Sequence, residues 1–362
     1  MNVCLIGNNL TSLTLAQSLV KKKIEVKLYS TSSKKFSKDF RTIGISSENL
    51  NFIDEEIIKI KKDKVWDINE IEIYDKTNSN KVLDFQSSNK KLFSIIKHDT
   101  FYTLLEQSLK KNKLFQKKKI TKKLDYKNIM ENKKFNLIIN CEKNNIFNKK
   151  FFSKRILKDY RSNAHTAILN HSKTKNRKAI QIFTKLGPIA FLPVSQANTS
   201  VVFSIKGKEL ADDELKKLIN ENNNFYKINN IRNIRRFKLK SQTARNYFYK
   251  NILLFGDGLH QIHPLAGQGF NMILRDIKNL LGLIDDRLTL GLPIDENILS
   301  EFTKNTKHLN ILFSSGIDFI HQFFMNDNDL LKQSSKSIFN YLNKNKTFNN
   351  FTINIANKGL NI

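Results

Sequence analysis

The sequence predicts an α/β fold in which a discontinuous nucleotide-binding type of domain holds an inserted antiparallel β-sheet and ends in a helical region. Three observations lead to this prediction. The chain opens with a strand, a glycine turn, a helix and a second strand. Its middle section contains short β-rich runs separated by turns, and a buried strand followed by a long helical stretch comes afterwards. The late buried strand and helix resemble the strand and helix that open the chain, so the chain is expected to leave the first domain and re-enter it.

The N-terminal unit has the pattern of two parallel strands joined by a helix. A buried strand is expected over residues 2–7, ending at Gly7, and apolar residues at helical spacing predict a helix over residues 11–22. Residues 24–29 alternate between apolar and polar side chains and predict the second strand. Such a βαβ unit is a frequent frame for nucleotide binding.

The remaining elements follow from the same periodicities. Helices are expected over residues 46–62 and 99–112, the second capped by Asp99, and from about residue 268 onward, with residues 296–345 rich in helix. Strands are expected over 68–74, 81–85, 135–141, 179–184, 189–194, 200–205 and 251–256, with a turn at Thr77–Asn80.

These elements divide into three predicted parts. A Rossmann-like domain comprises 1–75, 94–165 and 250–295; a β-rich domain for substrate comprises 76–93 with 166–249; the helical C-terminal region is 296–362. A ligand site is expected in the cleft between the first two parts.

Composition indicates a folded cytoplasmic protein without a signal peptide or a membrane-spanning segment. Cys4 and Cys141 lie in strand-like runs and are expected to be buried thiols. The net charge of +29 favours an anionic partner, although an AT-rich genome would also enrich lysine. The densest lysine cluster, between Lys110 and Lys123, has few aromatic residues. We therefore expect no nucleic-acid partner and prefer an anionic membrane surface.

The most informative segment is Gly256–Asn271, which reads GDGLHQIHPLAGQGFN between a buried strand and a helix. The carboxylate of Asp257 can accept hydrogen bonds from sugar-like hydroxyls, and the glycines allow close backbone approach to a flat ring or a phosphate. The start of the helix offers free amide groups to an anion or a negatively charged ring edge.

This segment resembles the second FAD fingerprint of the flavin aromatic hydroxylases, the class A flavoprotein monooxygenases, GD-x-x-H-x-x-x-P-x-x-G-x-G-x-N. It is most similar to the ubiquinone-biosynthesis hydroxylase branch, in which L-R-D follows, as in Leu274–Asp276. Three further regions resemble family motifs: residues 39–46, Phe183–Pro193, and a helical tail with Gly316–Phe319 and a closing Ala356–Leu360.

The resemblance implies an FAD-dependent monooxygenase that uses NAD(P)H and O₂ to hydroxylate the ring of a polyprenylated phenol in ubiquinone biosynthesis. It places the ribityl chain of FAD on Asp257 and the flavin close to Arg41, and it implies peripheral contact with the inner membrane and with other ubiquinone-biosynthesis proteins. No metal and no catalytic acid–base pair are expected. The implied cofactor-binding residues are Gly7, Asn9, Ser12, Ser30, Arg41, Gly256, Asp257, Pro264, Gly267, Gln268, Gly269 and Asn271.

The chain departs from the family at three places. Only Gly7 remains of the first G-x-G-x-x-G; the other two positions hold Asn9, which can adopt a left-handed conformation at modest cost, and the small Ser12. Ser30 replaces the glutamate that binds the adenosine ribose, and Asn140–Lys143 replaces G-A-D-G. A non-catalytic relative, acting as a structural or substrate-presenting partner, is therefore the alternative, and a flavin reductase or dehydrogenase acting on an isoprenoid is a third possibility.

Other candidate sites have simpler explanations. His260 and His263 lack a visible third metal ligand, so a structural loop role is preferred. The pair His98-Asp99 is better explained by helix capping than by catalysis. Absence of G-x-S-x-G and C-x-x-C leaves hydrolase and thiol-redox functions unsupported. Tyr29, Trp66, Phe191 and Phe203 are expected to pack in the core or the cleft.

Overall fold

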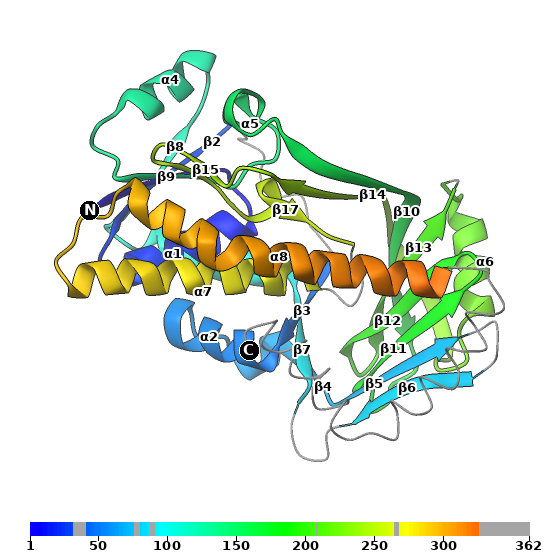
Figure 1. Ribbon diagram of the computed structural model, residues 1–362. Helices are drawn as coiled ribbons and strands as arrows, with labels where there is room; N and C mark the ends of the chain where they lie inside the picture. Colours follow the sequence, from blue (N-terminus) through cyan, green and yellow to red (C-terminus); the bar gives the residue numbers. More distant parts are fainter. Residues whose placement is uncertain (32–40, 76–79, 87–90, 208, 264–267, 326–362) are drawn as a thin grey trace.

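The computed structural model describes residues 1–31, 41–75, 80–86, 91–207, 209–263 and 268–325 (Figure 1). Within these residues the chain forms a six-stranded, an eight-stranded and a three-stranded sheet, with helices covering the first two. No helix in these ranges is both long and apolar enough to cross a membrane.

The six-stranded sheet contains the predicted nucleotide-binding unit. Its order is β15 (Phe248–Tyr249), β16 (Ile252–Leu254), β9 (Leu137–Asn140), β1 (Asn2–Ile6), β2 (Glu25–Ser30) and β8 (Phe115–Lys119). β1 pairs in parallel with both β2 and β9, and β16 pairs in parallel with β9. The predicted βαβ unit and the return of the chain to the first sheet are both confirmed.

Helix α1 (Leu10–Lys21) connects β1 to β2 and is almost wholly buried. It packs against α3 (His98–Lys110) and α7 (Gln268–Thr289), and accordingly most of its side chains are apolar or small. Cys4 in β1 and Cys141 after β9 are buried free thiols, as expected.

The eight-stranded sheet forms the second half of the molecule. Its order is β17 (His260–Gln261), β14 (Ile228–Ala244), β10 (Arg155–His171), β13 (Asn198–Lys206), β12 (Gly187–Ser195), β11 (Lys178–Thr184), β5 (Glu70–Asp75) and β6 (Asn80–Gln86). The pairs are antiparallel except β5 with β11, which confirms the antiparallel arrangement predicted for the three middle runs.

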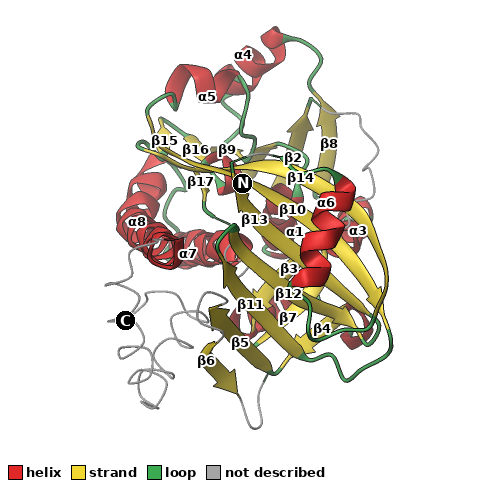
Figure 2. Ribbon diagram, turned by 90° about the vertical axis from the view of Figure 1, so that its right-hand side faces the viewer, coloured by secondary structure: helices red, strands yellow, loops and turns green. Residues whose placement is uncertain are grey.

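Alternation along these strands gives the sheet two different faces. Phe191 and Phe203 point into an apolar cluster under α6 (Asp212–Glu221), which crosses one face of the sheet (Figure 2). Their neighbours Ala190 and Val202, which are paired across β12 and β13, line a cavity on the opposite face. The expected packing role of the two phenylalanines is therefore confirmed as a core role.

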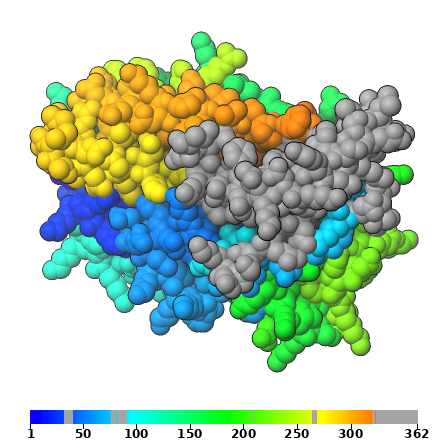
Figure 3. All heavy atoms as spheres, turned by 60° about the horizontal axis from the view of Figure 1, so that its bottom comes forward, coloured from blue at the N-terminus to red at the C-terminus, as the bar shows by residue number. Residues whose placement is uncertain are grey.

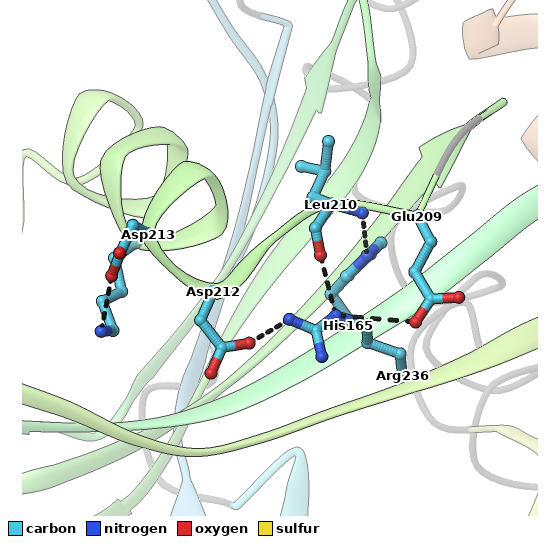
Figure 4. A network of polar contacts seen from close by, with 7 residues as sticks. His165, Glu209, Leu210, Asp212, Asp213 and Arg236 are labelled. Carbon is cyan, nitrogen blue, oxygen red and sulfur yellow. Dashed lines mark hydrogen bonds and ion pairs between the residues drawn. The ribbon is translucent and has the colours of Figure 1, made fainter.

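A polar network fixes the start of α6 to the sheet (Figure 4). Arg236 on β14 donates from Nε to the carbonyl of Leu210 at 2.9 Å and pairs with the carboxylate of Asp212. The amide of Leu210 donates to Nε2 of the buried His165 on β10, at 3.3 Å. Burial and the nearby Arg236 guanidinium lower the pKa of His165, which favours its neutral form.

A three-stranded sheet, β3 (Thr42–Ser46), β7 (Phe93–Lys97) and β4 (Val65–Ile68), lies between the larger sheets. The helix expected over 46–62 is wrong in its length. Helix α2 (Ser47–Phe52) continues as one π-helical turn, Ile53–Ile57, and a short 3-10 helix follows at Lys62–Lys64. Asp54 accepts a hydrogen bond from the amide of Ile60 at 2.8 Å, which fixes the chain beyond the turn.

Two long helices, α7 and α8 (Glu296–Met325), run along one side of the molecule next to each other (Figure 3). They confirm the predicted helical C-terminal region up to residue 325.

The N-cap residue of α3 is Lys97, whose side chain makes no capping hydrogen bond, so the prediction that Asp99 caps this helix is wrong. Asp99 lies instead in the first turn, where its negative charge interacts favourably with the helix dipole. The remaining helices are α4 (Lys123–Glu131) and α5 (Ile146–Phe151).

By hydrogen bonding, both β5 and β10 belong to the eight-stranded sheet. The division of the chain into domains at residues 75, 93, 165 and 249 remains a prediction. The predicted turn at 77–80 falls outside the described residues, except for Asn80.

Candidate functional site

A cavity of about 500 Å³ lies between the six-stranded sheet and the inner face of the eight-stranded sheet. One side is formed by the start of α1, the loop after β9, the segment after β16 and the start of α7. The other side is the sheet face that carries Ala190 and Val202. Four predicted cofactor residues line it: Asn9, Arg41, Asp257 and Gly269.

Two glycines under the cavity have no room for a side chain. Gly7 ends β1 with φ +116°, and a Cβ there would lie 2.9 Å from Cγ of Glu142. Gly256 has φ +59°, and its Cβ would lie 2.6 Å from Cγ2 of Thr11. Both positions therefore require glycine, because each combines a left-handed backbone with close packing. Neither glycine lines the cavity. Each allows close packing of two segments that border it, Gly7 against Glu142 and Gly256 against Thr11.

Asn9 precedes α1 as its N-cap residue. Its φ is −130°, so the backbone is extended and does not use the left-handed conformation that asparagine permits. The side chain instead caps the helix: Oδ1 accepts from the amide of Ser12 at 3.0 Å, and Oγ of Ser12 accepts from the amide of Asn9 at 3.1 Å. Nδ2 of Asn9 donates to the carbonyl of Cys141 at 2.8 Å, which ties this turn to the end of β9.

The capping box determines which amide groups at the helix start are left for a ligand. Those of Asn9 and Ser12 are used internally. Those of Leu10 and Thr11 belong to the first turn of α1, where an α-helix supplies no acceptor, and both residues line the cavity. The helix dipole adds a partial positive charge at the same place.

Asp257 lies on the 3-10 turn Gly256–Gly258 that follows β16. Its Oδ2 is 3.5 Å from Nζ of Lys143, which also donates to Oε1 of Gln261 at 3.2 Å. All three side chains line the cavity. The departure of Asn140–Lys143 from G-A-D-G does not by itself predict a role for Lys143, but a lysine where the family has glycine is the signal that could have found it.

The loop that carries Lys143 is held by an asparagine network. Oδ1 of Asn140 accepts from Asn145 at 2.7 Å, and Nδ2 of Asn140 donates to Asn148 at 2.7 Å. Asn148 also donates to the carbonyls of Glu142 and Lys143. Burial raises the pKa of the half-buried Glu142.

Asn271 and His260, both in the fingerprint, make buried contacts with protein groups. Asn271 donates to the carbonyl of Gly44 at 2.9 Å and accepts from the amide of Ser46 at 3.0 Å, so it clasps α7 to β3. His260 Nε2 lies 2.6 Å from Oδ2 of Asp276, and Oδ1 of Asp276 accepts from Nδ2 of Asn310 at 3.0 Å. These pairs fix β17, α7 and α8 around the cavity, and the described residues contain no group of three side chains able to hold a metal.

The remaining predicted residues take different positions. Arg41 is exposed at the cavity, and its carbonyl accepts from the amide of His98 at 2.9 Å. Ser30 is buried at the end of β2 and does not line the cavity. Gln268 begins α7, while Gly269 has space beside it, since an added Cβ would find its nearest neighbour at 3.8 Å. Pro264 and Gly267 lie outside the described residues, as do residues 39–40 and 356–360 of the resemblance.

The sequence did not predict which residues of the eight-stranded sheet line the cavity. It combines apolar side chains such as Leu192 and Ile168 with the basic Arg235 and Lys238 on β14. Asn233, also in the lining, has φ +59° at an irregularity where two residues of β14 lie opposite one of β10. Alternation of strand residues fixes which side chains face inward, but register between distant strands is not readable from one sequence.

Comparisons with solved structures give the same fold. The p-nitrophenol 4-monooxygenase PnpA from Pseudomonas putida DLL-E4 superposes with a TM-score of 0.78 at 9% identity, covering 98% of this chain and 98% of that chain. Klebsiella pneumoniae HpxO complexed with FAD and uric acid gives a TM-score of 0.73 at 11% identity, covering 99% and 96%.

Curated relatives match over shorter stretches. Ubiquinone biosynthesis monooxygenase COQ6, mitochondrial, from Caenorhabditis elegans is 24% identical over 242 residues, 54% of this chain and 54% of the relative. The protein of the same name from Dictyostelium discoideum is 25% identical over 186 residues, 41% and 38% respectively. Ubiquinone hydroxylase UbiL from Rhodospirillum rubrum is 26% identical over 179 residues, 46% and 41%. The chain thus spans about half or less of the length of these relatives.

A family model described as squalene epoxidase matches residues 147–358, which is more than half of the chain. The matched region starts in α5 and includes strands β10 to β14 of the eight-stranded sheet and the fingerprint with Asp257. Together with the fold, this confirms the resemblance inferred from the motifs. The chain belongs to the squalene epoxidase family.

Proposed function

We propose that the protein is an FAD-dependent monooxygenase that hydroxylates the aromatic ring of a polyprenylated phenol in ubiquinone biosynthesis, using NAD(P)H and O₂. The observation that carries this proposal is one cavity that joins fingerprint residues Asp257 and Gly269 to the start of α1 on one side and to the β-sheet on the other. A flavin and a ring substrate have to meet in such a space. Three relatives are named as ubiquinone biosynthesis monooxygenases or as a ubiquinone hydroxylase, which supports the pathway.

The residues on the cofactor side are suited to FAD. Amides of Leu10 and Thr11 can bind phosphate oxygens, and the carboxylate of Asp257 can accept from ribityl hydroxyls. The missing side chain at Gly269 leaves space for a flat ring beside the start of α7. The two glycines with positive φ hold these groups together, although only the first glycine of the N-terminal motif is present.

FAD supplies the oxygen chemistry when it is bound and reduced, and the protein supplies binding, orientation and exclusion of water. On the substrate side, Ala190, Leu192 and Val202 offer an apolar surface to a ring and a prenyl chain. Arg235 and Lys238 favour the phenolate over the phenol, because a nearby positive charge stabilises the anion. This raises electron density in the ring where oxygen is to be added.

The partners follow from the same proposal. NAD(P)H reduces the flavin without a second nucleotide-binding motif in the sequence. A prenylated substrate is membrane-soluble, so we place the protein in the cytoplasm and at the surface of the inner membrane, where the charge of +29 favours anionic lipid. Other ubiquinone-biosynthesis proteins are proposed partners.

The rival proposal is a non-catalytic relative that presents substrate or supports an assembly. Two contacts favour it: the capping box uses amides at the start of α1, and Lys143 pairs with Asp257, the residue proposed to bind the ribityl chain. A flavin reductase or dehydrogenase acting on an isoprenoid is a third candidate, which would bind FAD but form product without O₂.

The visible absorption spectrum of the purified chain distinguishes these proposals. Flavin bands near one FAD per chain, followed by O₂-dependent oxidation of NAD(P)H with a polyprenylated phenol, are the expected result. A folded chain that takes up no added FAD would contradict the monooxygenase and leave the non-catalytic relative. Product that forms equally well without O₂ would instead indicate the reductase or dehydrogenase.

A further inference from the structure

We propose that Lys143 binds the phosphates of FAD and replaces part of the contact that the missing glycines provide elsewhere in the family. This inference rests on the proposed function and adds to it a cofactor-binding residue. The first support is position: Lys143 follows β9 by three residues, and its side chain lines the same side of the cavity as Leu10 and Thr11.

The second support is the connection between the loop of Lys143 and the start of α1. The carbonyl of Cys141 accepts from Nδ2 of Asn9, the residue that caps α1, at 2.8 Å. Glu142 packs against Gly7 on the same turn. The loop after β9 is thus anchored at the amide groups where a phosphate is expected, and Lys143 extends from that anchor into the cavity.

The third support is the balance of charge. Described residues that line the cofactor side include the cations Arg41 and Lys143 and the carboxylate of Asp257. FAD brings two phosphate charges into this space, and the capping box leaves fewer backbone amides to meet them. A lysine amine on a fixed loop supplies the missing positive charge without needing backbone freedom.

The present contacts of Lys143 are compatible with this role. Its Nζ is 3.5 Å from Asp257 and 3.2 Å from Gln261, and its side chain is 38% exposed, so it is neither deeply buried nor rigidly held at its tip. The Asn140–Asn145–Asn148 network holds the backbone below it. The amine of Lys143 can therefore move from the carboxylate of Asp257 to a phosphate oxygen at a small cost in free energy.

The test measures FAD affinity of the full chain, freed of flavin and titrated by flavin fluorescence. We expect Lys143→Ala and Lys143→Gly to bind FAD about tenfold more weakly, the size of one charge-assisted hydrogen bond at a partly exposed group. Lys143→Arg is expected to retain most of the affinity. Lys149→Ala, which removes the same charge from the exposed surface of α5, serves as the matched control.

Two further measurements separate phosphate binding from an effect through Asp257. Added KCl is expected to weaken FAD binding less in Lys143→Ala than in the unaltered chain, because one screened charge pair is gone. The loss is also expected to persist in the Asp257→Asn background. A loss that disappears there, or an unchanged or tighter affinity of Lys143→Ala, would overturn the inference while leaving FAD binding by the unaltered chain intact. If the unaltered chain binds no FAD, the proposed function fails and this inference with it.

Discussion

Replacement of Asp257 by alanine tests where the cofactor binds. In the structure this carboxylate faces the cavity from a 3-10 turn and pairs with Lys143 at 3.5 Å, with its side chain 53% exposed. An exposed pair of this kind contributes about 0–1 kcal/mol, so we expect the free energy of unfolding to change by less than about 1 kcal/mol. The fold should therefore survive the substitution.

The effect on FAD is expected to be larger. Hydrogen bonds to a charged group contribute about 1.5–3 kcal/mol, which corresponds to about 10- to 150-fold in affinity. Partial exposure of Asp257 favours the lower part of this range. Flavin fluorescence titration gives the affinity and urea unfolding gives the stability. Asp213→Ala, which breaks an exposed pair with Lys216 on α6, is the control. Full FAD affinity in Asp257→Ala would refute the placement of the ribityl chain on this residue.

Three further changes test the scaffold around the cavity. Asn271→Ala removes the clasp to Gly44 and Ser46 and leaves buried polar groups unpaired, so we expect a loss of about 2–4 kcal/mol in urea unfolding; a loss below about 1 kcal/mol would contradict this role. Gly256→Ala adds a Cβ 2.6 Å from Cγ2 of Thr11 at a backbone φ of +59°, so we expect a loss of more than about 1 kcal/mol, with partial recovery in a Thr11→Ser background; equal losses in both backgrounds would argue against the contact. The folded state lowers the pKa of His165 below 6.5, so its contribution to the free energy of unfolding is present above that pH and is lost as the pH falls below it. Between pH 8 and 5 the free energy of unfolding should therefore decline less in His165→Gln than in the unaltered chain, and parallel profiles would contradict this.

Local periodicity was sufficient for much of the fold. The strand pattern of residues 2–7 and the helical spacing after Gly7 depend on neighbours within a few positions, and both elements formed as predicted. The helix over 46–62 failed because the apolar spacing continues past Phe52, while a π-turn and the side chain of Asp54 redirect the backbone. A pattern of apolar residues does not report such competition for backbone hydrogen bonds.

The sequence identified the fingerprint segment of the site, but not the long-range contacts that its residues make. Asp257 and Gly269 line the cavity, and their binding of the cofactor stays a prediction. Asn271 belongs to the same motif, yet its side chain bonds to β3, more than two hundred residues earlier in the chain. Lys143 meets Asp257 only because β9 and β16 are neighbours in the sheet. Contacts of this kind depend on strand order, which a single sequence does not contain.

The start of α1 presents different backbone donors from a glycine turn. A glycine turn offers backbone amides to a phosphate, whereas Asn9 and Ser12 use two such groups to cap the helix. Capping stabilises the helix by about 1 kcal/mol, so these substitutions favour the fold at the expense of the anion site. A side-chain cation from the neighbouring strand end restores positive charge at the same place without disturbing the cap. Lys143, joined to Asn9 through the carbonyl of Cys141, is in the position to do this. An asparagine cap at α1 and a lysine after β9 are therefore best understood as one change in how the chain binds phosphate, rather than as two separate losses from a motif.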